Sequence, residues 1–317
     1  MNATSRFLFA SLAFAGIAIV PTMAKASSDG QGGAKTEIIT KHTLDNLNNV
    51  KARNARDAKT GGARTVSGTG ISYHNGPVML GTTNVYVIWY GSWPDFSGSS
   101  STPVILTHLL SNIGGSPYFN INTSYYDGAK FAVSNSVHYA GSTIDKYSLG
   151  TALSDANIQT IVSSAIARGG LPSDTNGVYF VLTSSDVNAT SGFLTQYCGW
   201  HTHGTIGGAD IKYSFVGDPA RNYSACAAQT TSPNGNTSAD AMASVIAHEL
   251  EETVTDPDLN AWYDGRGYEN ADKCAWNFGT TSTTSTGAKV NMALGSRSFL
   301  IQQNWVNAGT GGCKLSY

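Results

Sequence analysis

The run Val85-Tyr86-Val87-Ile88-Trp89-Tyr90 consists entirely of β-branched and aromatic residues and ends at Gly91. This composition predicts a buried β-strand. A second apolar run, Val178 to Thr183, predicts another strand and is followed by the polar Ser184-Ser185-Asp186. Polar residues directly after a strand place loops with functional groups at the strand ends.

Two helices are predicted between these strands. Residues 102–113 form the first, with Pro103 in its first turn. Residues 154–168 form the second, because Ser154 can cap it and Gly169-Gly170 can end it. Strands that alternate with helices predict an α/β fold, with a mixed sheet and helices in layers. We expect residues 70–317 to form this single domain.

The first 26 residues have the pattern of a secretory signal peptide. Arg6 precedes an apolar run over residues 7–20, and Ala24-Lys25-Ala26 offers a small-residue cleavage site. No later stretch is apolar enough to span a bilayer, so no membrane association is expected after cleavage. The net charge of −2 gives no basic footprint for nucleic acid.

Residues 27–69 are polar and lack an apolar period, which predicts a flexible linker or a pro-segment. Residues 27–66 contain seven Lys or Arg and four Asp or Glu, a net charge of +3. Residues 67–317 contain 10 basic and 17 acidic residues, a net charge of −7. The leader therefore has two interpretations: an unstructured tail, or a basic segment that covers an acidic cleft.

An exported chain is expected to pair its cysteines as disulfides. The four cysteines allow three pairings, and no Cys-x-x-Cys spacing suggests a thiolate zinc site. Sequential pairing is the favoured prediction, Cys198 with Cys226 and Cys274 with Cys313.

The residues with the clearest chemistry lie on a predicted helix that begins at a capping pair, Thr237 and Asp240, and ends before Pro257. His248 and Glu252 are four residues apart, about 40° of rotation, so both can bind one metal ion. Glu249 lies beside them and could act as general base. This pattern resembles the helix of zinc peptidases, with Glu252 in place of the second histidine. It predicts a metallopeptidase-like layered core whose apolar helix face packs inward while the ligand face lines a cleft.

A hydrolytic zinc site needs a third protein ligand. Glu269 is the first choice, since the turn Asp264-Gly265-Arg266-Gly267 could return it over the helix. Asp272 is the second choice. The weaker alternatives are acids at the helix exit and histidines upstream, namely Asp256, Asp258, His201 and His203.

Two further side chains could stabilise an oxyanion, Tyr263 and His201. Core packing or scaffold hydrogen bonding explains both equally well. Zinc is the predicted cofactor, although a histidine with carboxylates also suits manganese or calcium.

Several blocks of the chain resemble one known family in the same order. They are Tyr73-His74-Asn75-Gly76-Pro77-Val78, Val87-Ile88-Trp89-Tyr90-Gly91, Tyr147-Ser148-Leu149-Gly150, Val181 to Val187, Cys198-Gly199-Trp200-His201, Val245 to Leu250 and Glu269 to Cys274. These blocks are similar to the EXORDIUM, or phosphate-induced protein 1, family over roughly residues 72–317. The resemblance implies a secreted, extracellular or cell-wall-associated protein, without an agreed reaction. Thr255-Asp256-Pro257 looks more like microbial relatives that resemble metallopeptidases.

Three functions follow as hypotheses. The first is a secreted zinc-dependent hydrolase that cleaves peptide bonds, with a peptide or cell-wall substrate. The second is a non-catalytic extracellular protein that binds glycan or a partner through exposed aromatic residues and holds only a structural metal. The third, with least support, is a glycosidase using Asp186 and Glu249. The sequence leaves the oligomeric state open.

Overall fold

The strand predicted around Val85 is an inner strand of a six-stranded mixed sheet. The computed structural model describes residues 36–39, 70–93 and 95–317. In spatial order the sheet strands are β1 (Thr36–Ile39), β8 (Tyr197–Ile206), β9 (Ala209–Gly217), β6 (Gly177–Thr183), β3 (Thr83–Tyr90) and β4 (Val137–Asp145). Strands β9, β6, β3 and β4 are parallel, whereas β8 runs antiparallel to both β9 and β1. The predicted mixed α/β sheet is confirmed.

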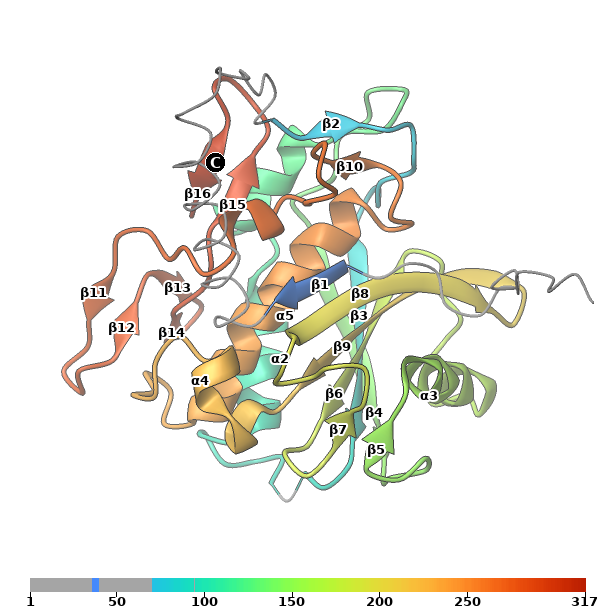
Figure 1. Ribbon diagram of the computed structural model, residues 1–317, viewed down its shortest axis with the longest axis vertical. Helices are drawn as coiled ribbons and strands as arrows, with labels where there is room; N and C mark the ends of the chain where they lie inside the picture. The colour runs from blue at the N-terminus through green and yellow to red at the C-terminus, as the bar shows by residue number, and fades with distance from the viewer. Residues whose placement is uncertain (1–35, 40–69, 94) are drawn as a thin grey trace, which may run out of the picture. The chain divides into compact units, whose positions relative to one another are not determined.

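The helices lie on both faces of the sheet, as Figure 1 shows. Helix α2 (Thr102–Asn112) connects β3 to β4, and α3 (Asp155–Ala167) leads from β4 back across β3 to β6. Because these crossovers run in opposite directions, right-handed connections place α2 and α3 on opposite faces. Helix α5 (Thr237–Thr255) packs against α2 and against β8 and β9. The two helices predicted before β6 are confirmed within one residue at each end.

Short elements complete the chain. The small two-stranded pairs are β2 (Ser72–Tyr73) with β10 (Trp262–Tyr263), β5 (Ala152–Leu153) with β7 (Asn188–Ala189), β11 (Ser282–Thr283) with β12 (Lys289–Val290), β13 (Met292–Leu294) with β14 (Arg297–Phe299), and β15 (Asn304–Val306) with β16 (Gly312–Lys314). The short helices are η2 (Phe119–Ser124), η3 (Pro219–Arg221), α4 (Tyr223–Cys226) and η4 (Asp272–Cys274). The last of these lies close to the end of α5.

The predicted signal peptide, residues 1–26, lies outside the described residues. Most of the predicted linker, residues 27–69, lies outside them as well, but four of its residues form β1 at the end of the sheet. Its role as a pro-segment stays a prediction. Among the described residues, no helix combines the length and apolar character that a bilayer span requires.

Both predicted disulfides are confirmed, and each fixes a segment close to a residue of the candidate site. Cys198 in β8 is bonded to Cys226 in α4. Cys274 in η4 is bonded to Cys313 in β16.

Helix α5 differs from its prediction in two ways. Its N-cap is Asn236, whose side chain accepts a hydrogen bond from the Ala239 N–H at 3.0 Å, so the predicted Thr237–Asp240 capping pair is wrong. Thr237 is already the first helical residue. The described residues also show no open cleft over this helix, because the apolar face and the face with His248 and Glu252 are both buried.

We expect Asn236→Ala to lower the free energy of unfolding by about 1–2 kcal/mol, because it removes the N-cap acceptor of α5. It also removes hydrogen bonds from Asn236 Nδ2 to Ser100 O and Thr102 Oγ1, both 3.0 Å, which join α5 to the start of α2. Thr237→Ala is the control and should cost about 0.5 kcal/mol or less. Urea unfolding of both variants tests the assignment, and a larger loss for Thr237→Ala would contradict it.

Candidate metal centre

Helix α5 packs directly on β8 because Gly199 has no side chain. A Cβ atom on Gly199 would lie 2.6 Å from Val245 Cγ1, 2.9 Å from Phe215 O and 3.2 Å from Glu249 Oε1. The first two distances are shorter than van der Waals contact allows, so glycine sets the separation of helix and strand. The carboxylate of Glu249 consequently lies directly against the backbone of β8.

Helix α5 contributes the two predicted ligands, His248 and Glu252, and their side chains meet. His248 Nε2 is 3.0 Å from Glu252 Oε1, and both side chains have 0% exposure. Because the two residues are one helical turn apart, their side chains meet as the spacing predicts.

Strand β8 contributes His201, which the sequence offered as a weaker alternative for the third ligand and as an oxyanion stabiliser. His201 Nε2 lies 3.0 Å from Glu269 Oε2 and 3.6 Å from Glu252 Oε2. The imidazole is completely buried. His201 therefore stands among the carboxylates, in a position suited to a ligand.

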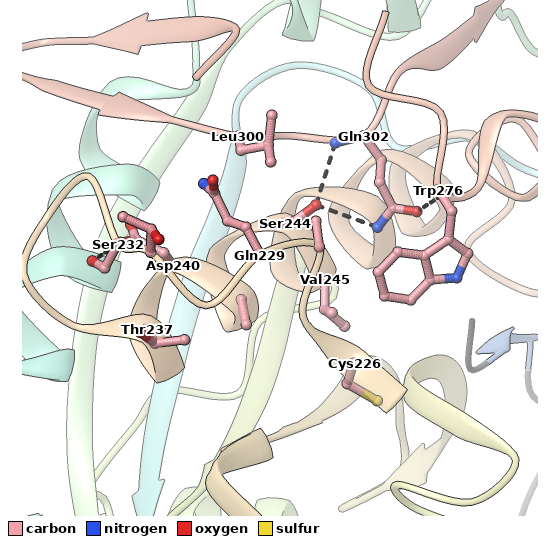
Figure 2. A pocket seen from close by; sticks show the side chains of 13 residues that line it. Cys226, Gln229, Ser232, Thr237, Asp240, Ser244, Val245, Trp276, Leu300 and Gln302 are labelled. Carbon is pink, nitrogen blue, oxygen red and sulfur yellow. Dashed lines mark hydrogen bonds between the residues drawn. The ribbon is translucent and has the colours of Figure 1, made fainter. Parts of the chain in front are cut away.

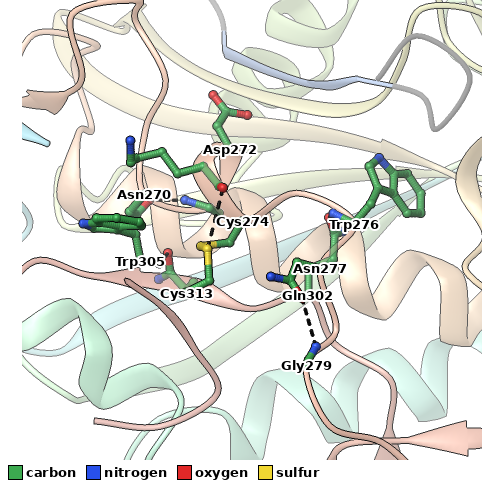
Figure 3. The surroundings of a disulfide bond; sticks show 12 residues. Asn270, Asp272, Cys274, Trp276, Asn277, Gly279, Gln302, Trp305 and Cys313 are labelled. Carbon is green, nitrogen blue, oxygen red and sulfur yellow. Dashed lines mark hydrogen bonds between the residues drawn. A yellow bond between two sulfur atoms is a disulfide. The ribbon is translucent and has the colours of Figure 1, made fainter. Parts of the chain in front are cut away.

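The loop after β10 contributes the two acids that the sequence offered as third ligands. Asp272 Oδ1 is 3.5 Å from His248 Nε2, and the Asp272 N–H donates to Glu252 Oε1 at 2.9 Å. Glu269 contacts His201 instead. Figure 3 shows Asp272 beside the Cys274–Cys313 disulfide, which fixes this segment to β16.

The predicted turn at residues 264–267 holds the same loop. The carboxylate of Asp264 accepts from the backbone N–H groups of Arg266 and Tyr268. It also pairs with the side chains of Arg266 at 3.1 Å and Lys273 at 3.2 Å. These hydrogen bonds and cations lower the pKa of Asp264 to about 2, although its burial opposes them.

Among the described residues, three groups of three are compact enough to hold one ion, and Glu252 belongs to the two groups at this place. In each group the potential ligand atoms lie within 4.8 Å of one another. The two groups with Glu252 are His248 with Glu252 and Asp272, and His201 with Glu249 and Glu252. The two oxygens of Glu252 face different imidazoles, since Oε1 is near His248 and Oε2 is near His201.

The pKa shifts follow from burying acids beside imidazoles. Burial lowers the pKa of His201 to about 4, which leaves it neutral. Burial also opposes the charge of His248, but the carboxylate of Glu252 outweighs it and raises the pKa of His248 well above its ordinary value. Burial, together with the carboxylate of Asp272, raises the pKa of Glu252. A bound divalent cation would compete with the proton that this shift favours on His248.

The donor set fits a zinc ion by a test that is independent of the helix motif. Within the described residues, neither Nε2 of His248 nor Oε2 of Glu252 makes a hydrogen bond. Buried polar atoms without partners are costly. Imidazole nitrogen and carboxylate oxygen are both ligands that zinc takes, so an ion would satisfy these atoms.

Glu251, the third acid of the helix motif, has a different role. Its carboxylate accepts a hydrogen bond from Asn304 Nδ2, and its backbone carbonyl accepts from Asn270 Nδ2 at 3.2 Å. Burial raises the pKa of Glu251 well above its ordinary value, while Asn122 and Asn304 oppose the shift. The expected repulsion among three neighbouring glutamates is therefore reduced, because Glu251 lies in an asparagine network.

Several predicted candidates lie elsewhere. Tyr263 stacks on His74 with ring centroids 3.7 Å apart, and its backbone carbonyl lies 3.2 Å from His74 Nε2. Asp256 is an exception at the border of the cluster: it ends α5 by accepting from the Asn260 and Ala261 N–H groups, both at 2.6 Å, and its side chain also hydrogen-bonds Glu269. Asp186 follows β6, where it accepts from Ser184 and Tyr147.

His203 and Asp258 form a separate polar group with Asp210. Lys212 Nζ lies 2.6 Å from Asp210 Oδ2 and 3.7 Å from Asp258 Oδ1, so a lysine already supplies positive charge there. We do not assign a metal to this group.

The pocket in Figure 2 lies along the N-terminal half of α5 and does not contain the cluster. Its volume is about 20 Å³, which suits a single water. Ser244 Oγ accepts there from the N–H and the side-chain amide of Gln302, at 3.2 and 3.3 Å. These bonds attach the segment after β14 to α5 and serve the scaffold.

The comparisons with known proteins agree with the resemblance seen in the sequence. The family model described as the phosphate-induced protein 1 conserved region matches residues 71–307. The chain belongs to this family. The match includes α5, β8 and the loop with Glu269 and Asp272.

Among the curated members, Protein EXORDIUM-like 5 of Arabidopsis thaliana is 32% identical, over 74% of this chain and 75% of its own length. Protein EXORDIUM-like 3 of the same plant is 31% identical, over 74% of this chain and 80% of its own. Protein PHOSPHATE-INDUCED 1 of Nicotiana tabacum is 27% identical, over 62% and 67%. No solved structure matches the chain. The two disulfides of this family member fit an oxidising compartment.

The two disulfides should contribute equally to stability but unequally to metal binding. They close loops of 28 and 39 residues, so losing either is expected to cost about 3–4 kcal/mol. In Cys198→Ser/Cys226→Ser, the pairing of β8 with β9 still holds His201. In Cys274→Ser/Cys313→Ser, the segment with Asp272 loses its covalent anchor, and we expect the zinc Kd to rise roughly tenfold or more.

Thermal unfolding and zinc titration of the two double variants test this difference. Equal zinc affinities would show that the Cys274–Cys313 bond does not position the site.

Proposed function

We propose that this protein is a secreted, zinc-dependent hydrolase of the phosphate-induced protein 1 family that cleaves peptide bonds. One observation carries the proposal. Three segments of the chain, α5, β8 and residues 269–272, bring two imidazoles and several carboxylates to one buried place.

His248, Glu252 and Asp272 are the proposed metal ligands. Asp272 is preferred to Glu269 as the third ligand because its carboxylate faces His248, whereas Glu269 pairs with His201. When bound, zinc would polarise the scissile carbonyl and lower the pKa of its water. Three carboxylate or imidazole ligands from the protein leave a fourth position for water or substrate.

Glu249 is the proposed general base. It lies within reach of His201 and Glu252 and against the backbone of Gly199. Its carboxylate would take a proton from the attacking water and pass it to the leaving nitrogen as the C–N bond breaks. His201, neutral and held by Glu269, would donate or accept at the same centre.

The second candidate is a non-catalytic protein with a structural metal, and complete burial favours it. His201, His248, Glu249 and Glu252 each have 0% exposure, and structural zinc sites are closed in this way. The proposed glycan platform has less support, since none of the six tryptophans is exposed. The exposed aromatic residues in the described part of the chain are Phe96, Phe131 and Tyr317.

Glu249→Gln separates the two candidates. For a hydrolase, we expect it to retain zinc and lose about 10²–10⁴-fold in kcat, because it keeps the shape of the side chain but cannot accept the proton. His248→Ala should lose both zinc and activity. The measurements are zinc content of the purified protein and cleavage of casein.

Glu251→Gln is the matched control, since it makes the same change on a neighbouring residue that faces the asparagine network. It should retain zinc and activity. Asp272→Asn and Glu269→Gln should be compared by zinc content, and a larger loss for Glu269→Gln would reassign the third ligand. Zinc without cleavage in the wild type would favour the structural metal.

A further inference from the structure

The strand that carries His201 has an occupied outer edge. Strand β8 pairs with β9 on one side, and on the other it pairs with β1, a segment of the chain's own leader. The register sets Thr36 opposite His201, Glu37 opposite Trp200, Ile38 opposite Gly199 and Ile39 opposite Tyr197. Figure 1 shows β1 at this end of the sheet, next to β8. Without β1, the edge of β8 would be unpaired.

This pairing passes directly by the candidate catalytic groups. Thr36 is opposite His201, whose imidazole faces Glu269 and Glu252. Ile38 is opposite Gly199, and the Glu249 carboxylate lies against Gly199. An extended peptide paired with the same edge would therefore run along the site. Backbone hydrogen bonds to a sheet edge bind extended peptides of many sequences, which is a common mode of recognition.

With β1 in place, the candidate groups among the described residues are closed to such a peptide. The side chains of His201, His248, Glu249 and Glu252 are all 0% exposed. Helix α5 and strands β8 and β9 belong to the hydrophobic core and cannot move aside cheaply. Strand β1 has only four residues and pairs with one neighbour, so it is the element that can leave at least cost.

The charges of the two parts also attract each other. Residues 27–66 carry a net charge of +3, and residues 67–317 carry −7. Opposite net charges favour association of a leader with its own domain.

We propose that the outer edge of β8 is a binding site for an extended peptide and that Thr36–Ile39 occupies it in the full-length chain. The leader then keeps the protein latent, and displacement of β1 opens the edge. The peptide site stands on the pairing of β1 with β8. Only its use for cleavage rests on the proposed function.

The test uses the secreted chain, residues 27–317, with the double substitution Glu37→Pro/Ile38→Pro. Alternate residues of an edge strand direct their N–H groups toward the neighbouring strand, so two consecutive prolines disrupt the pairing in either register. Glu37→Val/Ile38→Val is the matched control, because valine keeps both N–H groups and favours strands. The probe is a fluorescein-labelled peptide with the sequence of residues 34–41, Ala-Lys-Thr-Glu-Ile-Ile-Thr-Lys.

We expect the peptide to bind the proline variant at least tenfold more tightly than the wild type or the valine control, by fluorescence anisotropy. Zinc-loaded proline variant should also cleave casein at least tenfold faster. Binding without cleavage would support the peptide site and contradict the hydrolase. Equal binding and equal cleavage by all three proteins would overturn the latency and leave the hydrolase intact. Failure of the proline variant to bind the peptide would overturn the peptide site.

Hydrogen exchange of the wild type provides a test that does not require the proline variant to fold. If β1 can leave alone, the β8 amides that face β1 exchange at least tenfold faster than the β8 amides that face β9. Equal protection of both sets would mean that β1 leaves only on global unfolding, which would overturn the proposal.

Discussion

The contact between α5 and β8 is the constraint on which the site depends. A helix buried on all sides ordinarily carries apolar residues, yet α5 has one histidine and three glutamates within five positions. Each buried acid needs a partner, because an uncompensated charge in the core is strongly destabilising. Glu251 obtains its partner from asparagines, whereas Glu252 meets His248 and His201. The surrounding chain is arranged to supply these partners.

The local part of this arrangement could be predicted from the sequence. The strands at 85–90 and 178–183 and the two helices between them depend on short apolar patterns, and the structure confirms them. The meeting of His248 with Glu252 depends only on the helical repeat. The choice of Asn236 over Thr237 as N-cap depends on one residue's backbone conformation, which the sequence pattern does not fix.

The long-range part could not be predicted in the same way. His201 joins the cluster because β8 is added antiparallel to β9, beside α5, and a strand order of this kind is not encoded in a local pattern. The sequence contained only a modest indication that His201 and Glu269 belong to the site. Both lie close to cysteines that form disulfides, so both belong to fixed segments. Four residues of an otherwise polar leader form a strand for a related reason, since the edge of β8 supplies the hydrogen bonds that the leader's composition does not suggest.

The two proposed functions differ in whether the buried cluster can open, and the position of β1 bears on that difference. A structural metal site would remain closed after the leader is removed, because its walls would be core elements. Here the outer edge of β8, the strand that carries His201, is covered by β1. This strand has four residues and comes from a segment whose net charge is opposite to that of the domain. A protein that needed only a rigid metal site would gain little from adding β1, since β9 and the Cys198–Cys226 disulfide already hold β8. An edge strand beside the buried Glu249, the proposed general base, is therefore better explained by control of access than by stability.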